Sequence, residues 1–427
     1  MSAESRPRRR HGPRAFVLLV SAWGWSAAAA RAAASDESEP AVSGASGLTW
    51  HGGIASIVRG RCERCHRDGG AAPFPLVTRD DVAGRAAMIR QVIATGVMPP
   101  WFATRDSGPF RDDLSLRDEE RRDLLAWLQA DSPAGVASGP EPARAWPSGW
   151  SIGEPDLILT LPHPIEVPAT GVLDYKYIDI PFTVEDDVWV QAYEVRCDHP
   201  SICHHIEIDI CQRELRILDV LDGYLPGKPP TIYPEGMARQ IRKGSILRLR
   251  LHLTPNGTPV VERLRIGFRF AKEPPAWIVA GRKLNVREIR IPPGKPDYTV
   301  SRGRKLPAAA ELMRVIPHMH LRGRSAKIEI LFPDGRTIAP LTIERWHPDW
   351  QFAYEFAERI QVPEGTEIRC TFTYDNSAAN PFNPDPERTV FYGPQIWDEM
   401  GGCFFEWARP AEEVATGAPD RRASRGR

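Results

Sequence analysis

The sequence predicts a multi-domain protein in which a small all-α domain precedes two all-β antiparallel domains, each a jelly-roll-like sandwich. Three observations support this fold class. Apolar residues recur at helical spacing only in about residues 49–134. Short alternating runs separated by turns fill residues 151–408. The 41 prolines and 34 glycines among the 427 residues favour many short strands and turns over a helical bundle.

Residues 1–34 have the pattern of a secretory signal peptide. Several arginines precede an apolar run over residues 15–30, and small residues follow, with cleavage expected after Ala30 or Ala34. The alternative is an uncleaved anchor helix, although the apolar run is short for a membrane span. We therefore expect a periplasmic or secreted protein, with no integral membrane span in the mature chain. Residues 35–48 are predicted to be a flexible lead-in.

The charge balance argues against a nucleic-acid partner. The whole chain has 55 basic and 55 acidic residues, and the predicted signal peptide contains six of the basic residues and one of the acidic ones. The mature chain would therefore have a net charge of −5. A nucleic-acid-binding protein would need a basic surface.

Residues 49–134 are predicted to form the small all-α domain. Ser115 and the acidic residues after it are typical of a helix start. Residues 135–150 are rich in Ala, Gly and Pro and are predicted to be a linker. The segments with helical spacing are 53–61, 79–95 and 116–130.

The β region is expected to contain two sandwiches, because residues 151–408 exceed the roughly 100 residues of one such domain. A Pro- and Gly-rich stretch at 292–296 lies near the midpoint, and we place the boundary near residue 285, which gives domains 151–285 and 286–408. Residues 409–427 are predicted to be a disordered tail. The expected strands include 156–161, 175–181, 188–195, 246–253, 326–332, 367–374 and 403–407.

Cys62-Glu-Arg-Cys65-His66 has the spacing of a c-type haem attachment site. The two thiols would form thioether bonds, and the imidazole of His66 would bind the iron from one face. The alternatives for a bare Cys-x-x-Cys are a disulfide redox pair and a zinc half-site. The adjacent histidine and the export signal favour haem.

Met98 is the expected sixth ligand of the haem iron. It lies in a Pro-rich loop, Met98-Pro-Pro-Trp101, after a predicted helix, and a thioether ligand raises the reduction potential. The alternative is a core methionine. The block resembles a small monohaem cytochrome c, in particular the modules fused to bacterial copper monooxygenase-like proteins. This resemblance is carried by Ala72-Pro-Phe-Pro-Leu76 and by the Met98 loop.

Three histidines fall on predicted strands of the first sandwich. His204 and His205 are adjacent, so both rings can bind one metal only if the strand twists or bulges there. His252 alternates with leucines and therefore points away from the sandwich core. Taken alone, the histidine pair is as consistent with a structural role, and His252 with an ordinary surface residue.

His318 and His320 are two residues apart in the second sandwich, so both rings project from the same strand face. Met400 would add a soft thioether, although core packing explains a lone methionine equally well. Two imidazoles and a thioether favour copper over zinc.

In this order the six residues resemble the type 2 copper, ascorbate-dependent monooxygenases, the family of peptidylglycine and dopamine hydroxylating enzymes and their bacterial relatives. The resemblance covers about residues 155–408. It implies two β-sandwich domains, each with one copper, that face one another across a solvent cleft. It matches His204, His205 and His252 to the electron-transfer copper, and His318, His320 and Met400, as the catalytic residues, to the copper that binds dioxygen.

The chain departs from the peptidylglycine enzymes at the positions that hold the peptide. An Arg two residues before the His-x-His pair is Ile316 here, and an Asn and a Tyr after the methionine are Gly402 and Phe404. We therefore do not expect a C-terminal glycine peptide as substrate.

The remaining five cysteines leave several pairings open. Cys370 and Cys403 are candidates for a disulfide that steadies the methionine loop. Cys197, Cys203 and Cys211 cannot be paired from the sequence.

The sequence thus predicts a copper-dependent monooxygenase with two copper ions and one covalent haem c. It would use dioxygen to hydroxylate a C–H bond of a small organic substrate. Electrons would come from an ascorbate-like reductant or a periplasmic redox protein, through the fused haem. The alternative is a non-catalytic periplasmic electron-transfer or copper-binding protein. A zinc-dependent hydrolase is disfavoured because the histidine pairs lack an adjacent acidic ligand.

Overall fold

A nine-stranded sheet runs through the β region and is shared by its two halves. The computed structural model describes residues 48–137, 139 and 146–416, so the predicted signal peptide and nearly all of the lead-in lie outside the described residues. In spatial order the large sheet contains β1 (Leu157–Thr160), β11 (Arg265–Phe270), β4 (Val188–Arg196), β8 (Met237–Ile241), β12 (Trp277–Val286), β21 (Gly401–Pro410), β15 (Ala310–His318) and β18 (Tyr354–Val362), and β7 (Thr231–Ile232) pairs with β4.

Two four-stranded sheets each belong to one half, and two short antiparallel pairs of strands complete the β structure. The first is β3 (Lys176–Pro181), β9 (Ile246–Leu253), β5 (Cys203–Cys211) and β6 (Ile217–Tyr224); the second is β14 (Tyr298–Lys305), β19 (Glu367–Tyr374), β16 (Gly323–Leu331) and β17 (Thr337–Ile343). The pairs are β2 (Ile165–Val167) with β10 (Val260–Glu262) and β13 (Arg290–Ile291) with β20 (Val390–Phe391), and short 3-10 turns cover Pro200–Ile202 and Arg213–Leu215.

Each four-stranded sheet packs its apolar face on part of the large sheet, which confirms the β-sandwich architecture. In the first half, Leu249 of β9 and Phe268 of β11 belong to one buried cluster. In the second half, Phe372 of β19 and Phe405 of β21 belong to another. Alternate side chains of a strand point to opposite faces, so the alternating sequence pattern leads directly to these two cores.

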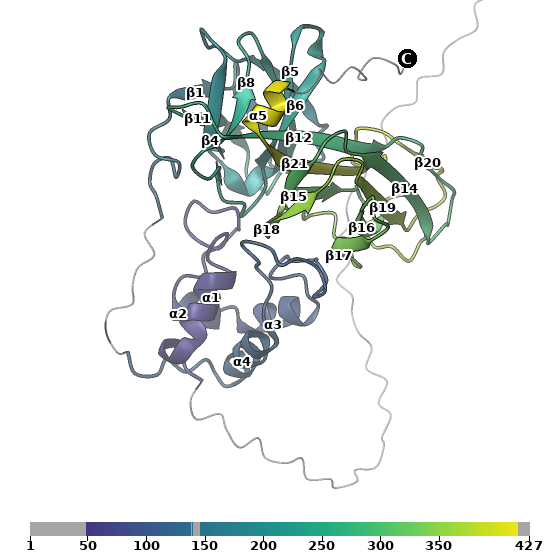
Figure 1. Cartoon of the computed structure of the whole chain (residues 1–427). Coiled ribbons are helices and arrows are strands. Elements are labelled where there is room, and N and C mark those ends of the chain that lie inside the picture. Colours follow the sequence, from purple (N-terminus) through teal and green to yellow (C-terminus); the bar gives the residue numbers. More distant parts are fainter. Residues whose placement is uncertain (1–47, 138, 140–145, 417–427) are drawn as a thin grey trace, which may run out of the picture. The chain divides into compact units, whose positions relative to one another are not determined.

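Strand β12 joins the two halves. It pairs antiparallel with β21 over ten residues, from Trp277↔Pro410 to Val286↔Gly401, and in parallel with β8 over three residues (Figure 1). The boundary expected near residue 285 falls at the end of this strand. The large sheet is therefore continuous across that boundary.

The helical segments lie at 50–129. Gly53, with a φ of 133°, kinks the first predicted helix, and the second breaks at Gly84 and Arg85. Trp50 and Trp127 are buried together in a separate apolar cluster. The elements are a π-helical turn (Trp50–Ile54), α1 (Ala55–Arg61), α2 (Arg79–Ala83), α3 (Ala86–Ala94) and α4 (Asp118–Gln129).

The chain stays ordered further toward its C-terminus than the sequence predicts. Arg409 and Pro410 complete β21, and Ala411–Thr416 form α5. The predicted disordered tail, 409–427, is therefore wrong for its first eight residues. The reason is that Ala411 N donates a hydrogen bond to Ala276 O, which continues the pairing of β21 with β12.

No helix within the described ranges is long and apolar enough to cross a membrane.

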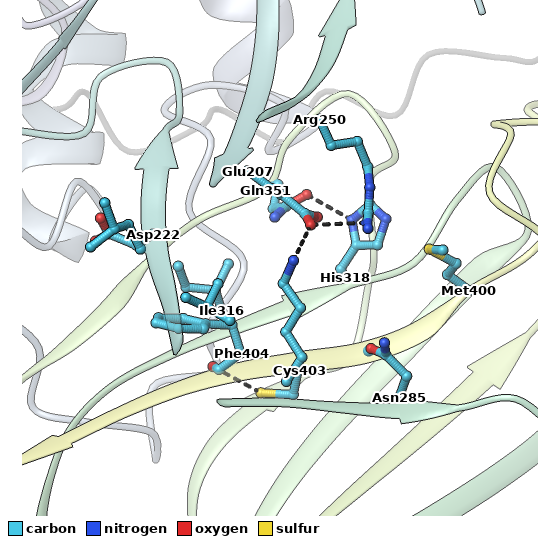
Figure 2. A pocket seen from close by; sticks show the side chains of 14 residues that line it. Glu207, Asp222, Arg250, Asn285, Ile316, His318, Gln351, Met400, Cys403 and Phe404 are labelled. Carbon is cyan, nitrogen blue, oxygen red and sulfur yellow. Dashed lines mark hydrogen bonds and ion pairs between the residues drawn. The ribbon is translucent and has the colours of Figure 1, made fainter. Parts of the chain in front are cut away.

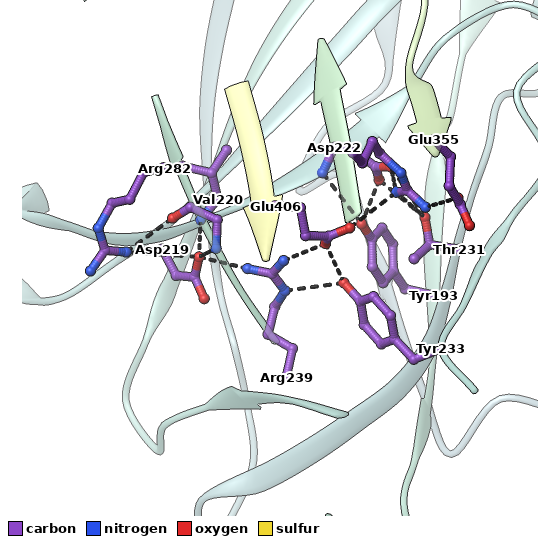
Figure 3. A network of polar contacts seen from close by, with 12 residues as sticks. Tyr193, Asp219, Val220, Asp222, Thr231, Tyr233, Arg239, Arg282, Glu355 and Glu406 are labelled. Atoms are coloured by element: carbon purple, nitrogen blue, oxygen red, sulfur yellow. Dashed lines mark hydrogen bonds and ion pairs between the residues drawn. The ribbon is translucent and has the colours of Figure 1, made fainter. Parts of the chain in front are cut away.

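A buried network of charged groups ties strands of both halves together (Figure 3). The Glu406 carboxylate on β21 accepts hydrogen bonds from Arg239 of β8 and from the Tyr233 hydroxyl, the latter at 2.7 Å. Arg314 of β15 lies 3.4 Å from Glu406 and also pairs with Asp222 of β6. Lys228 and Arg314 lower the pKa of Asp222 to about 2, against the opposing effect of burial. Each buried charge therefore has an opposite charge beside it.

Removing one member of this network should destabilise the protein strongly. Glu406→Gln leaves Arg239 and Arg314 without a carboxylate between them, and the loss of one partner of a buried pair costs about 3–5 kcal/mol. We expect this fall in the free energy of unfolding in denaturant titrations. The control is Glu329→Gln, which breaks the partly exposed Lys327–Glu329 pair and should leave the transition unchanged; equal effects would contradict the interpretation.

Candidate metal centre

Three imidazoles converge from the adjacent strands β5 and β9. Strand β5 has a register shift between Cys203 and His205, so the irregularity that the sequence requires is present, and His205 lies opposite His252. The candidate ligand atoms of His204, His205 and His252 all lie within 4.8 Å of one another. The Nδ1 atoms of His204 and His205 are 3.0 Å apart. We call these three residues the first histidine group.

The second histidine group is His318 and His320, at the end of β15. Met319, between them, is buried in the second core, so both imidazoles project to the other side, with ring centroids 5.0 Å apart. His320 Nδ1 lies 3.2 Å from the carbonyl oxygen of Asp398, and His318 Nδ1 lies 2.7 Å from Gln351 Oε1. A carbonyl oxygen only accepts, so Nδ1 of His320 carries the proton and Nε2 presents its lone pair.

Met400 lies immediately before β21 and lines a cavity together with His318 and Gln351 (Figure 2). Its backbone is fixed, because Met400 O accepts a hydrogen bond of 2.8 Å from the Tyr374 hydroxyl. The structure therefore brings Met400 to the second histidine group, on the side of His318.

The two histidine groups lie against one another. The ring centroids of His205 and His318 are 5.5 Å apart, and the Tyr175 ring is 4.6 Å from His252 and 6.1 Å from His320. All five histidines line one enclosed space of only about 10 Å³. The expected solvent cleft between the groups is therefore wrong. Tyr175 and the segment before β18 fill the position where a cleft would lie.

The unpaired nitrogens of both groups fit a metal. His205 Nε2, His252 Nδ1 and His320 Nε2 are buried and have no hydrogen-bond partner. A buried polar atom left unpaired costs about 1–3 kcal/mol, and coordination to a metal would remove this cost. The geometry thus provides lone pairs from imidazoles of both groups, together with the thioether of Met400.

Burial keeps the imidazoles in the neutral form that binds metals. Burial, with a smaller effect of the neighbouring His318, lowers the pKa of His204 to about 4. Burial and the nearby His204 and His318 lower the pKa of His252 to about 3. Burial also lowers the pKa values of His205, His318 and His320. At neutral pH, protons therefore compete little with a metal for these ring nitrogens.

A group of half-buried ion pairs lines the cavity beside His318 and Met400 (Figure 2). Glu207 accepts from Arg250 at 2.9 Å and from Lys283 at 2.7 Å, and Lys283 also bonds Asp209 at 2.7 Å. Two positive and two negative charges thus neutralise one another. The cavity has a volume of about 40 Å³, and Ile316 and Phe404 lie on its apolar side.

The four residues expected to hold the haem also share a cavity. Cys62, Cys65, His66 and Met98 line a space of about 570 Å³, much of it bounded by prolines and aliphatic side chains. His66 Nδ1 lies 3.0 Å from the carbonyl oxygen of Phe74, which leaves Nε2 for a metal. His204 and His252 line the same cavity. The first histidine group therefore forms part of the wall of the space expected to take the haem.

Two further pairs of cysteines come together. Cys197 Sγ and Cys203 Sγ are 2.8 Å apart, directly before His204. Cys370 on β19 and Cys403 on β21 are buried in the same apolar cluster. All seven cysteines are present as thiols, so the disulfide between Cys370 and Cys403 stays a prediction, and Cys197 with Cys203 is a second candidate pair.

The sequence did not identify Gln351, Tyr175 or the Glu207–Lys283 ion pair as parts of the site. The sequence gives no signal for them, because these contacts join segments that are distant in the chain, such as Gln351 and His318, 33 residues apart. The carbonyl of Asp398, two residues before Met400, was also missed, since backbone partners depend on conformation rather than on residue type.

Comparisons with known proteins identify no family for this chain. No family model matches the chain, and no curated protein matches it. Among solved structures, it is similar to the major capsid protein P2 of bacteriophage PM2, with 9% identity, a TM-score of 0.28 and coverage of 60% of this chain and 97% of that chain. The corresponding values for the STIV MCP are 9%, 0.33, 61% and 98%, and for an allantoicase 11%, 0.18, 57% and 80%. Similarities with such TM-scores carry no inference about this chain.

Loss of one imidazole should weaken copper binding at the first histidine group. We expect His252→Ala to raise the dissociation constant there by more than the about 10- to 100-fold that loss of an outer-shell partner causes. Competition of the metal-free protein with a copper chelator measures this. His163→Ala, at an exposed turn, is the control; equal affinities for both variants would rule out His252 as a ligand.

Proposed function

We propose that this protein is a copper-dependent monooxygenase that hydroxylates a C–H bond of a small organic molecule with dioxygen. The observation that carries the proposal is the convergence of five imidazoles, three of them buried and with an unpaired nitrogen, while a thioether lines the adjoining cavity together with His318. Imidazole and thioether ligands together suit copper.

Each metal would have its own set of residues. His204, His205 and His252 would hold one copper, and His318, His320 and Met400 the other. Cys62 and Cys65 would attach a haem c, with His66 and Met98 as axial ligands. When bound, the coppers supply oxygen activation and the haem supplies electrons.

The chain's own residues orient these ligands and exclude water. Gln351 and the Asp398 carbonyl each bond the Nδ1 atom of one histidine, which fixes the ring and directs Nε2 into the site. Tyr175 packs against both histidine groups. No side chain is needed as a general base, because the metal carries the chemistry.

The cavity beside His318 favours a small substrate without net charge. Ile316, Gly402 and Phe404, which replace the peptide-holding residues of the peptidylglycine enzymes, all line it. Lys283 is neutralised by Glu207 and Asp209, so it is not available for a substrate carboxylate. A C-terminal glycine peptide does not suit this lining.

Export would bring the protein to its metals, haem and reductants. The predicted signal peptide, followed by a periplasmic or secreted location, is part of the proposal, and so is an electron donor that is either an ascorbate-like reductant or a periplasmic redox protein. N-terminal sequencing of protein recovered from the periplasm tests cleavage after Ala30 or Ala34; an intact N-terminus would contradict it.

A non-catalytic electron-transfer or copper-binding protein is the second candidate. The specific observation in its favour is the enclosure of the five histidines in a space of about 10 Å³, which leaves little room for dioxygen and substrate. An electron-transfer site needs no such room.

Metal analysis together with oxygen uptake separates the two candidates. For the monooxygenase we expect two coppers and one haem per chain in protein made in a haem-competent periplasm, with oxygen consumption that depends on an added organic compound. Oxidation of the reduced haem should accompany product formation. Two coppers without substrate-dependent uptake across a broad set of compounds would favour the second candidate, and a haem that stays reduced while product forms with ascorbate would disprove its role as donor.

Replacement of Met98 tests the sixth haem ligand. Met98→Ala should remove the thioether and lower the reduction potential of the haem, because a methionine ligand raises it. Visible spectra and a redox titration measure both effects. Met88→Ala is the matched control, since Met88 on α3 is 51% exposed; equal potentials in the two variants would exclude Met98.

A further inference from the structure

The segment Arg345–Gln351 connects β17 to β18 and contacts all three groups of predicted ligands. Its first residue reaches the loop of Met98, its middle reaches His204, and its last residue reaches His318. Each of the three contacts joins parts of the chain that are distant in the sequence.

Arg345 fixes the start of the Met98 loop. Its guanidinium donates two hydrogen bonds of 2.7 Å, to the carbonyl oxygens of Thr95 and Gly96. Gly96 has a φ of +65°, and a Cβ atom there would lie 2.7 Å from Arg345 Nη2. The backbone conformation therefore favours glycine, and a Cβ atom would also displace the guanidinium. Met98 follows two residues later.

The middle of the segment lies beside His204. Pro348 lines the same space of about 10 Å³ as His204. Asp349 and Trp350 line the cavity of about 570 Å³, which His204, Met98 and His66 also line. The same short stretch of chain thus lies beside one predicted copper ligand and bounds the predicted haem cavity.

The end of the segment holds His318. Gln351 is buried and lies 2.7 Å from His318 Nδ1. Between the two ends, Trp346 is anchored in the second core, and its backbone nitrogen donates to Arg324 O at 2.8 Å. With a core anchor and contacts at both ends, the segment has little freedom to move at one contact without shifting another.

We propose that Arg345–Gln351 is a positioning segment that sets the Met98 loop and the two histidine groups relative to one another. This inference rests on the proposed function. The segment touches no substrate; it acts through the ligands that it holds. It links the electron-donating part of the protein to the oxygen-reacting part by direct contacts rather than by a flexible tether.

The decisive variant is Arg345→Met, which keeps the length of the side chain and removes both hydrogen bonds without altering any predicted ligand. We expect faster hydrogen exchange of backbone amides around both Met98 and His204 in the metal-free protein. In the loaded protein we expect a lower haem potential, a changed copper EPR spectrum and about tenfold weaker copper binding at the first histidine group, as for loss of outer-shell support.

A further variant keeps the test independent of folding defects. Arg345→Lys keeps the positive charge at this position and should restore the wild-type behaviour in part. Arg336→Met, on an exposed turn of the same half, is the matched control and should resemble the wild type in all measurements.

Changes confined to the Met98 loop, or the absence of changes at both places, would overturn the inference. The hydrogen-exchange measurement needs no metal. If the wild type binds no copper, the proposed function fails, and exchange rates still decide whether the segment couples the two regions.

Discussion

The pairing of β12 with β21 is the interaction on which the rest of this structure depends. Ten consecutive residue pairs join a strand of the first half to the last strand of the second, and β15, which ends at His318, pairs with the other edge of β21. The two sandwiches therefore share one sheet and are not separate bodies. Backbone hydrogen bonds leave little freedom in strand register, so this sheet fixes His318 at the end of β15. His205 lies on β5 of the first four-stranded sheet, and its contact with His318 depends on the packing of that sheet against the large one.

Charged side chains and histidines both lie near the place where the two halves meet. Where the halves meet, Glu406, Arg239, Arg314 and Asp222 neutralise one another. The histidines lie on other strands, with His205 on β5 and His252 on β9, and only His318 shares β15 with Arg314. Three histidine nitrogens have no hydrogen-bond partner. A protein interior normally pairs its polar groups, and both regions retain buried atoms without a hydrogen-bond partner, among them Arg314 Nε and Glu406 Oε2 of the charged network. Under the proposed function, coordination to a metal would satisfy the histidine nitrogens.

The close contact of the two histidine groups changes the expected organisation of the site. The family resemblance implies two metals separated by solvent, whereas here the rings of His205 and His318 are 5.5 Å apart and Tyr175 packs on both groups. The segment Arg345–Gln351 closes the remaining space and reaches the Met98 loop. The orientation of the histidine rings in such a site depends on the groups that contact them, as Gln351 contacts His318.

Local features could be predicted from the order of residues alone. Alternation of apolar residues predicted strands such as β9 and β19 with their exact bounds, the His-x-His spacing placed His318 and His320 on one face, and the neighbouring His204 and His205 required the irregularity that β5 shows. Each of these follows from side-chain direction along one strand. Only the tertiary structure decided that the large sheet is continuous across residue 285, that the two histidine groups touch, and that Gln351 and Arg345 support ligands far away in the chain. These contacts arise from strand pairing between distant segments, which no local pattern of residue types specifies.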